Sequence, residues 1–499
     1  MKTWTVGVDV GVRSTHRAEV VDERFEPVFH ARFTTHPEAI DRFLHELASR
    51  KPAEVSVRFV LEPTGSVWKT LAAYLVARGY AVYQATPTEV HGMRAAMGHR
   101  HRKTDKLDAL ALAKLPAVAP ERIRPVLLPP DPRWEQLQRG VRREHKLARR
   151  IANSTNELQA LLDEAIPGLA SLFPDPAQPL AQAIYRYWSH PGRLARQAPE
   201  KLARTLTRQS GRPVSVEEAA TLVELARQAV ALGRAQEPAA SALCREIACE
   251  LRLFNLLTQE QRQVQAENYA LYRDLDPQGH VQSLPGVGEV AAPALLSLKP
   301  LVDRLPKTRQ LRAYSGYVPK VEQSGQRVGH PRMSKAGPAW LKRILYMAAD
   351  AARRVDPQLA QVYRRAMMEK GAPHTKAVCA VVPHLLDRLF CVLKENRPYE
   401  FRDLAQQPVE RTEARALAQA LAVPEEVRRR LRVRQKAMDQ HRRGPSRREG
   451  HRPEGPGDPQ RERPPALSVP MQTPGSNALG IERVARSATR GPLACKATP

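Results

Sequence analysis

Two aspartates in the first quarter of the chain form the first pattern that could do chemistry. Asp105 and Asp108 stand three residues apart and are followed by good helix formers. On a helix this spacing places both carboxylates on one face, where their like charges repel. A divalent cation such as Mg²⁺ offsets that repulsion, because it binds oxygen ligands. A solvated acidic surface flanked by Lys103 and Lys106 is the alternative that this stretch alone leaves open.

Of two further acids, Asp9 stands inside the predicted first strand and Glu62 ends the fourth. Asp9 follows the apolar residues 6–8, and Glu62 precedes the turn residues 63–65. A carboxylate buried in a strand without a partner is costly, and strand-end loops commonly carry functional groups. Together the four acids predict a site for Mg²⁺, or for Mn²⁺ in its place. The four acids are Asp9, Glu62, Asp105 and Asp108.

The elements that must position these acids follow from hydrophobic spacing. We expect strands at 3–10, 17–22, 27–34, 55–61 and 80–85, and helices at 37–49, 66–78, from Pro87 onward, and around Asp105 and Asp108. This order predicts a mixed α/β sheet covered by helices, and it matches the ribonuclease H-like fold, which carries acids on its first strand, near its fourth strand and on a late helix. The proline-rich residues 115–132 are predicted to be a linker.

The charge of the chain indicates a polyanionic partner. Its 499 residues contain 79 Lys and Arg against 52 Asp and Glu, a net charge of +27, which favours nucleic acid over a merely solvated basic surface. The five cysteines form no Cys-x-x-Cys pair, so neither a zinc ribbon nor a disulfide framework is indicated. Without a signal peptide pattern or a long apolar run, the sequence predicts a cytoplasmic protein that does not contact the membrane.

The middle of the chain has long helical patterns, whereas its end has a biased composition. Residues 134–162 and 216–273 have long helical patterns, which predict an extended arm that is either a coiled coil used for dimerisation or an ordinary helical bundle. The residues between, 167–212, give no clear pattern. Residues 428–499 are rich in Arg, Pro, Gly and Ser, so we expect a largely disordered basic tail.

A glycine-containing turn precedes the apolar residues 291–298. The sequence Leu-Pro-Gly-Val-Gly at 284–288 is typical of a helix-hairpin-helix turn, in which Gly286 and Gly288 allow a tight bend and expose amides that can hold a phosphate. A plain turn between helices is the alternative.

A serine among cations follows this turn. Ser324 precedes a glycine, and the cations around it are Arg327, Arg332, Lys335 and Arg343. Such a setting can lower the pKa of a hydroxyl and offset charge on a phosphate under attack. From the residues alone, a loop serine that binds phosphate through its hydroxyl is the better interpretation.

Taken together, these stretches resemble the DEDD transposases of bacterial insertion sequences, the insertion sequence one hundred and ten group, which includes the pilin-gene invertases. The matching stretches are 7–10, 61–65, 103–109, 284–288, 314–319, 324–325 and 334–337. The resemblance covers most of residues 1–400 in the expected order.

The resemblance implies a domain organisation and a set of site residues. It implies a RuvC-like metal-binding domain, which we place at 1–130, and a transposase domain with a helix-hairpin-helix-like turn, which we place at 276–400. From the residues themselves we expect a helical arm at 131–275 and a basic, largely disordered tail at 401–499. By motif match, the four acids bind the metal and Ser324 is the nucleophile, with Ser315 and Ser334 as other candidates.

The implied activity is transposition by strand cleavage and exchange through a covalent phosphoserine. The implied partners are DNA, as element ends and target, an element-encoded structured guide RNA, and further copies of the chain in dimers that pair into tetramers at the bacterial nucleoid. Two alternatives stay open: a RuvC-like endonuclease that uses metal and water only, and a catalytically inactive nucleic-acid-binding relative.

Overall fold

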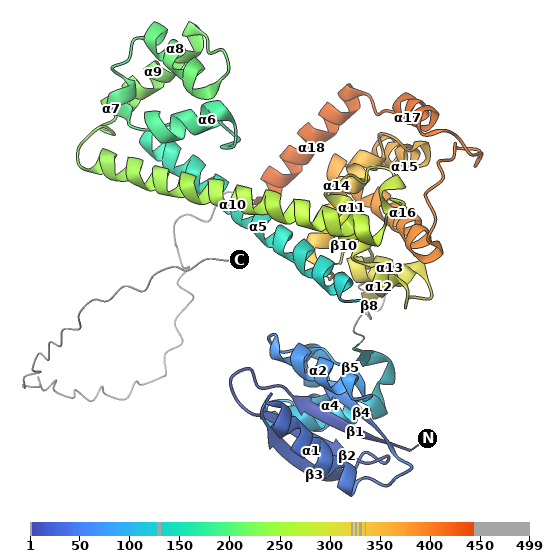
Figure 1. Cartoon of the computed structure of the whole chain (residues 1–499). Helices are drawn as coiled ribbons and strands as arrows, with labels where there is room; N and C mark the ends of the chain where they lie inside the picture. Colours follow the sequence, from blue (N-terminus) through green and yellow to red (C-terminus); the bar gives the residue numbers. More distant parts are fainter. Residues whose placement is uncertain are drawn as a thin grey trace, which may run out of the picture. The chain divides into compact units, whose positions relative to one another are not determined.

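The computed structural model describes residues 2–126, 131–320, 323–324, 327–328, 332–334 and 336–443 (Figure 1). Within these ranges, the side chains of residues 319–333, 436 and 439–443 lie outside the description. The chain begins with a mixed α/β sheet and continues as a mainly helical remainder. In the part of the chain that is described, no helix combines the length and apolar character that a membrane span needs.

The N-terminal sheet has the strand order β3-β2-β1-β4-β5-β6. Its strands are β1 (Thr3–Asp9), β2 (His16–Val21), β3 (Pro27–Phe33), β4 (Ser56–Leu61), β5 (Ala81–Gln84) and β6 (Arg124–Pro125). β1 pairs antiparallel with β2 and parallel with β4, and β5 extends the parallel part. The five predicted strands are confirmed with small shifts of their ends, and the order fits a ribonuclease H-like sheet.

Helices cover both faces of this sheet. One core joins β1 and β4 to α1 (Pro37–Arg50) and α2 (Val67–Ala77). A second core joins β4 and β5 to α3 (Pro87–Ala96) and α4 (Asp105–Val118). The predicted linker at 115–132 differs from the structure, because α4 continues through Pro116 and β6 then pairs with β5.

The arm consists of two long helices within one chain. α5 (Pro132–Ala165) and α10 (Ala239–Leu275) lie side by side (Figure 1). Arg143 Nη2 lies 2.9 Å from Glu260 Oε2, and Ser154 Oγ donates a hydrogen bond of 2.5 Å to Glu250. Because later residues of α5 meet earlier residues of α10, the pair is antiparallel.

The tip of the arm has its own core, between the outer ends of α5 and α10. Its elements are α6 (Pro179–Ala183), η3 (Ile184–Trp188), α7 (Pro191–Leu194), α8 (Pro199–Ser210) and α9 (Val216–Ala231). Residues 167–212 gave no clear sequence pattern because the helices are short, and their prolines stand at first helical positions, where proline is tolerated. The stretch 216–273, expected as one pattern, is divided into α9 and α10.

The C-terminal part is built around one large core, to which the base of the arm contributes Leu137 and Tyr272. Its helices are η4 (Val281–Ser283), α11 (Ala291–Leu296), α12 (Lys299–Val302), α13 (Thr308–Ser315), α14 (Ala339–Ala352), α15 (Pro357–Met368), α16 (His374–Glu395), α17 (Arg411–Ala420) and α18 (Glu425–Arg443). Its two-residue strands are β7 (Pro319–Lys320), β8 (Gln323–Ser324), β9 (Arg327–Val328) and β10 (Arg332–Met333).

The beginning of the predicted disordered tail is helical. Ala414 and Ala418 of α17, Val423 between the two helices and Leu431 of α18 are buried, and Val423 and Leu431 belong to the core of the C-terminal part. The prediction is therefore wrong for residues 411–443, because apolar residues at helical spacing stand among the arginines and overall composition hides them. Residues 444–499 lie outside the description.

Candidate functional site

Asp9 and Glu62 lie at the same edge of the N-terminal sheet. β1 and β4 are parallel, and the last pair in their register is Val8 with Leu61. The next residue on each chain is Asp9 and Glu62, respectively. Since the carboxyl ends of parallel strands meet at one edge, the two carboxylates are neighbours, as the sequence predicted.

Gly7 brings α4 onto the same face of β1 that carries Asp9. A Cβ atom on Gly7 would lie 2.1 Å from the carbonyl oxygen of Ala109 and 2.3 Å from the amide nitrogen of Ala113. Only glycine lets the helix backbone cross the strand this closely. Because side chains alternate along a strand, Asp9 shares the face of Gly7 and thus the face covered by α4.

The first turn of α4 carries the other two acids. Thr104 caps the helix, and its Oγ1 accepts a hydrogen bond of 3.2 Å from the Leu107 amide. Asp105 and Asp108 follow in the first turn, where the helix dipole favours negative charge. The cap therefore fixes where the helix begins and places both carboxylates near the sheet edge.

Asp108 is buried and has a cationic neighbour on α3. Arg94 Nε lies 2.7 Å from Asp108 Oδ1, close enough for an ion pair. The N–H direction is poor, and neither atom makes a hydrogen bond within the described residues. Arg94 could not be recognised in the sequence, since one arginine on a helix gives no sign of its partner.

The charges of the other three acids act on Asp9. Burial and, after it, the charges of Asp105, Asp108 and Glu62 together raise the pKa of Asp9 from 3.8 to about 6, against the opposing charge of Lys103. Burial also raises the pKa of Glu62, as does the charge of Asp108, while Lys103 and Arg94 oppose these effects. The structure thus brings the four predicted acids into one electrostatic cluster.

The cluster is not a ready-made metal cage. Among the residues that the structure describes, no three acid, histidine or cysteine side chains are close enough to hold an ion together. The carboxylate oxygens are nevertheless the ligands that Mg²⁺ and Mn²⁺ prefer, and Oδ1 of Asp108 is buried without a hydrogen bond. The residue types and their placement at one edge fit a divalent cation.

A second ion pair lies beside Asp9, also unnoticed in the sequence. Arg17 on β2 is in register with Asp9, and its Nη2 lies 2.6 Å from Oε1 of the buried Glu19. Glu19 is itself in register with Gly7, so both charged side chains face α4. Charges at alternate positions of an otherwise apolar strand were the signal that could have found them.

The predicted nucleophile lies in a short strand. Ser324 is the second residue of β8 and pairs with Arg327 of β9, and Arg332 lies in β10. The side chains of these three residues, and Lys335 altogether, lie outside the description. Arg343 is exposed on α14.

The other two candidate serines have local hydrogen-bond partners. Ser315 is fully buried, its hydroxyl donates to the Arg312 carbonyl oxygen at 2.7 Å, and it accepts from the Tyr317 amide at 3.3 Å. Such a satisfied, buried serine closes the end of α13. The Ser334 hydroxyl accepts a hydrogen bond of 3.1 Å from the Ala336 amide and is half-buried.

The glycine turn has a packing role. Gly286 has a φ of +72°, and a Cβ there would lie 2.3 Å from the Ala348 carbonyl oxygen and 2.4 Å from the Ala352 amide nitrogen, both on α14. Gly286 therefore lets the turn lie directly against that helix. A Cβ on Gly288 would meet no atom within 4 Å.

Comparison with known proteins joins both halves of the chain to one family. Residues 6–167 match a family model described as transposase, and residues 278–364 match one described as the transposase IS116/IS110/IS902 family. The first match contains the four acids, and the second contains the glycine turn and Ser324.

Two relatives give the same result. The "Insertion element IS116 uncharacterized 44.8 kDa protein" of Streptomyces clavuligerus is 23% identical over 392 residues, which cover 79% of this chain and 95% of that protein. The "Insertion element IS110 uncharacterized 43.6 kDa protein" of Streptomyces coelicolor is 27% identical over 144 residues, or 29% of this chain and 35% of that protein. The chain is a transposase of the IS110 family.

Proposed function

We propose that the chain cleaves and exchanges DNA strands at a divalent-metal site formed by its four converging acids. The observation that carries this proposal is that Asp9 and Glu62 follow paired parallel strands, while α4, which packs on this face at Gly7, carries Asp105 and Asp108 in its first turn. Three separate elements supply these acids to one sheet edge. Arg94 pairs with Asp108, and the like charges of the other acids are costly unless a cation binds them.

Asp9, Glu62, Asp105 and Asp108 would hold Mg²⁺ or Mn²⁺. When bound, the ion supplies positive charge that polarises and orients a scissile phosphate. The protein contributes the rest: Arg94 neutralises Asp108 until the ion takes its place, and Lys103 offsets the charges of Asp9 and Glu62.

The serine region would perform the covalent step. The Ser324 hydroxyl attacks the phosphorus, a bond between phosphorus and the serine oxygen forms, and the bond to the departing strand oxygen breaks. The serine loses its proton and the departing strand takes one up. The ester keeps the energy of the broken phosphodiester, so the reverse attack by another strand end rejoins DNA without an added nucleotide. Arg327, Arg332, Lys335 and Arg343 would offset the phosphate charge, and Gly286 and Gly288 would offer backbone amides to a more distant phosphate.

The partners follow from the same proposal. DNA is the substrate class of a transposase, and the net charge of +27 supports binding of nucleic acid. We include in the proposal a structured guide RNA and assembly of dimers into tetramers, with the α5–α10 arm as a surface for assembly. The expected location is the nucleoid in the bacterial cytoplasm.

The metal proposal is tested with Asp105→Asn in the full chain, on a plasmid that carries the element ends and a target. Loss of a metal-binding carboxylate is expected to lower recombination by at least about a hundredfold. Glu54→Gln is the matched control, since Glu54 is an exposed acid before β4, at the opposite end of that strand from Glu62. Equal activity of the two variants would exclude the proposed site.

A further inference from the structure

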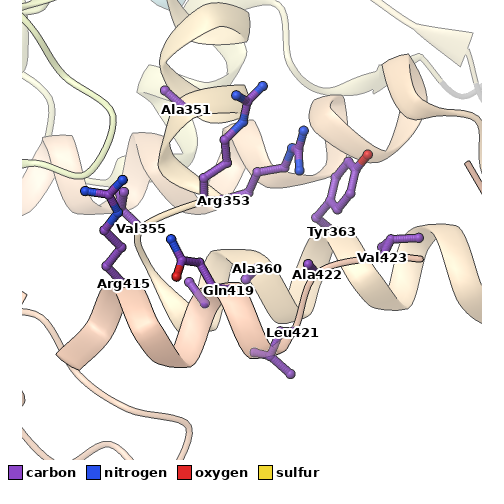
Figure 2. Close-up of a pocket in the computed structure, with 12 residues that line it drawn as sticks. Ala351, Arg353, Val355, Ala360, Tyr363, Arg415, Gln419, Leu421, Ala422 and Val423 are labelled. Carbon is purple, nitrogen blue, oxygen red and sulfur yellow. The ribbon is translucent and has the colours of Figure 1, made fainter. Parts of the chain in front are cut away.

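A hollow of about 450 Å³ lies between the end of α14, α15 and α17, far along the chain from the acids and outside the serine region (Figure 2). Arg353 and Arg354 follow α14 on one side, and Arg415 and Gln419 extend from α17 on the other. In Figure 2, Arg415 and Gln419 rise from successive turns toward Arg353. Small apolar side chains form much of the remaining wall.

The α17 wall is a fixed part of the domain. Ala414 and Ala418 are buried at 0% and 3% exposure, and Val423 after the helix belongs to the C-terminal core. Arg364 of α15 also donates a hydrogen bond of 3.3 Å to the Ala422 carbonyl oxygen. The hollow is therefore held between packed elements.

The arginines that line the hollow outnumber the carboxylates that pair with them. Arg353 and Arg354 share one partner, Asp350, at 2.8 and 2.7 Å. Arg415 makes no ion pair or hydrogen bond within the described residues, so its charge is not offset.

The first turns of α18 add to this excess. Arg428 and Arg432 share one carboxylate, Glu425, at 2.6 and 3.8 Å. Both arginines act on the groups that flank the hollow: burial raises the pKa of the Tyr363 hydroxyl and Arg428 partly opposes this, while burial lowers the pKa of His374 and Arg432 adds to this.

The shape of the site restricts what it can bind. The Arg353 guanidinium lies 4.0 Å above the ring of Tyr363, whose hydroxyl is 2.9 Å from His374 Nδ1. Burial lowers the pKa of His374, so at neutral pH the arginines alone carry the positive charge. Guanidinium groups bind phosphate oxygens through two parallel N–H donors, and the Gln419 amide adds a further donor.

We propose that this hollow binds a backbone phosphate of a nucleic acid strand. The proposal rests on the DNA-processing function of the family and adds an anchor at a distance in sequence from the chemistry. The α17 wall lies beyond residues 278–364, which match the transposase family. The anchor is thus completed by the C-terminal helices of this chain.

The first test measures binding of the full chain to a short mixed-sequence DNA duplex over a range of salt concentrations. Arg415→Ala should weaken binding roughly tenfold at moderate salt and reduce the slope of log affinity against log salt by about one, equally for two unrelated sequences. Arg227→Ala is the control: Arg227 lies exposed on α9 and has no partner within the described residues. Equal behaviour of the two variants, both with wild-type melting temperatures, would overturn the proposal.

A second test localises the contact and identifies the phosphate source. Phenylglyoxal modifies accessible arginines, and peptide mass spectrometry reports the modification of each one. The duplex should protect Arg415 and leave Arg227 reactive, whereas AMP at the same phosphate concentration should protect neither. Equal protection by AMP would make the hollow a mononucleotide site, and no protection by the duplex would mean that no strand binds there; both results contradict the proposal. The protection is measured without divalent metal, so a failure here is separate from a failure of the metal site.

Discussion

Arg94 and Asp108 form a buried ion pair that joins α3 to the first turn of α4. Their side chains are 9% and 6% exposed, and Arg94 Nε lies 2.7 Å from Asp108 Oδ1. The arginine supplies positive charge at the position where the proposed metal ion would supply it. Arginine and ion therefore compete for the same carboxylate, and the competition is measurable.

Arg94→Met should make the protein depend on the metal for stability. Removing one partner of a buried pair leaves the other charge uncompensated, which costs about 3–5 kcal/mol. A divalent cation that binds Asp108 would offset this cost, so Mg²⁺ should raise the melting temperature of the variant more than that of the wild type.

The control for this prediction is Arg50→Met. Arg50 pairs with Glu46 on the surface of α1, where both side chains are about half exposed, and such pairs contribute little to stability. Mg²⁺ should shift the melting temperature of this variant and of the wild type equally. If Arg94→Met shows the same shift as the wild type, Arg94 and the ion do not compete.

The raised pKa of Asp9 predicts how metal binding depends on pH. The folded protein holds this proton more tightly than the unfolded chain, because the pKa rises from 3.8 to about 6. Without metal, the contribution of Asp9 to stability is greatest below pH 4 and is lost as the pH rises through 6.

Metal binding needs the ionised carboxylate, so its pH dependence has the opposite sign. The rise in melting temperature caused by Mg²⁺ should be small below pH 6 and should increase as the pH passes through 6. Calorimetry with and without Mg²⁺ at several pH values measures this rise. In Asp9→Asn the effect of Mg²⁺ on the melting temperature should no longer increase near pH 6. An increase that persists there belongs to another titrating group.

Gly7→Ala should displace α4 and the acids that it carries. The added Cβ would lie 2.1 and 2.3 Å from backbone atoms of α4, which cannot rotate away as a side chain can. Overpacking of this kind costs about 1–3 kcal/mol, and recombination should fall further than the loss of stability explains. Gly92→Ala in α3 is the control, since a Cβ there meets nothing within 4 Å. Wild-type recombination by Gly7→Ala would show that the close approach is dispensable.

Ser324→Ala should abolish a covalent protein–DNA adduct. With suicide substrates that trap the intermediate, the wild type and Ser334→Ala should both give a band of reduced mobility on a denaturing gel. If the band survives in Ser324→Ala and is lost in Ser334→Ala, the nucleophile is Ser334. If the wild type cleaves DNA without any adduct, water is the nucleophile and the endonuclease alternative is favoured.

The sheet and its acids could be predicted because their signals are local. An apolar run that ends in Asp9, another that ends before Glu62, and the pair at Asp105 and Asp108 each show in a few consecutive residues. Parallel pairing of the two strands then brings the acids together. The fold of the N-terminal part and its four acids can therefore be predicted from a few consecutive residues at a time.

The partners of the acids could not be predicted, because tertiary packing chooses them. Arg94 is 14 residues from Asp108 on another helix, and the helix crossing that joins them depends on Gly7 in a distant strand. Helices α17 and α18 were missed for a different reason: a few apolar residues at helical spacing fix them, while arginine dominates their composition.

Because α5 and α10 are antiparallel, the length of the two helices sets how far the tip of the arm lies from the C-terminal core. The chain leaves the C-terminal core at Val141 and returns to it at Tyr272, so equal numbers of turns removed from both helices would shorten the arm and leave each end intact. Each residue taken from both helices would bring the tip about 1.5 Å closer. The length of the arm can therefore change while the four acids and the serine region stay as they are. Any partner of the tip would have to bind at a distance from the C-terminal core that the length of the two helices sets.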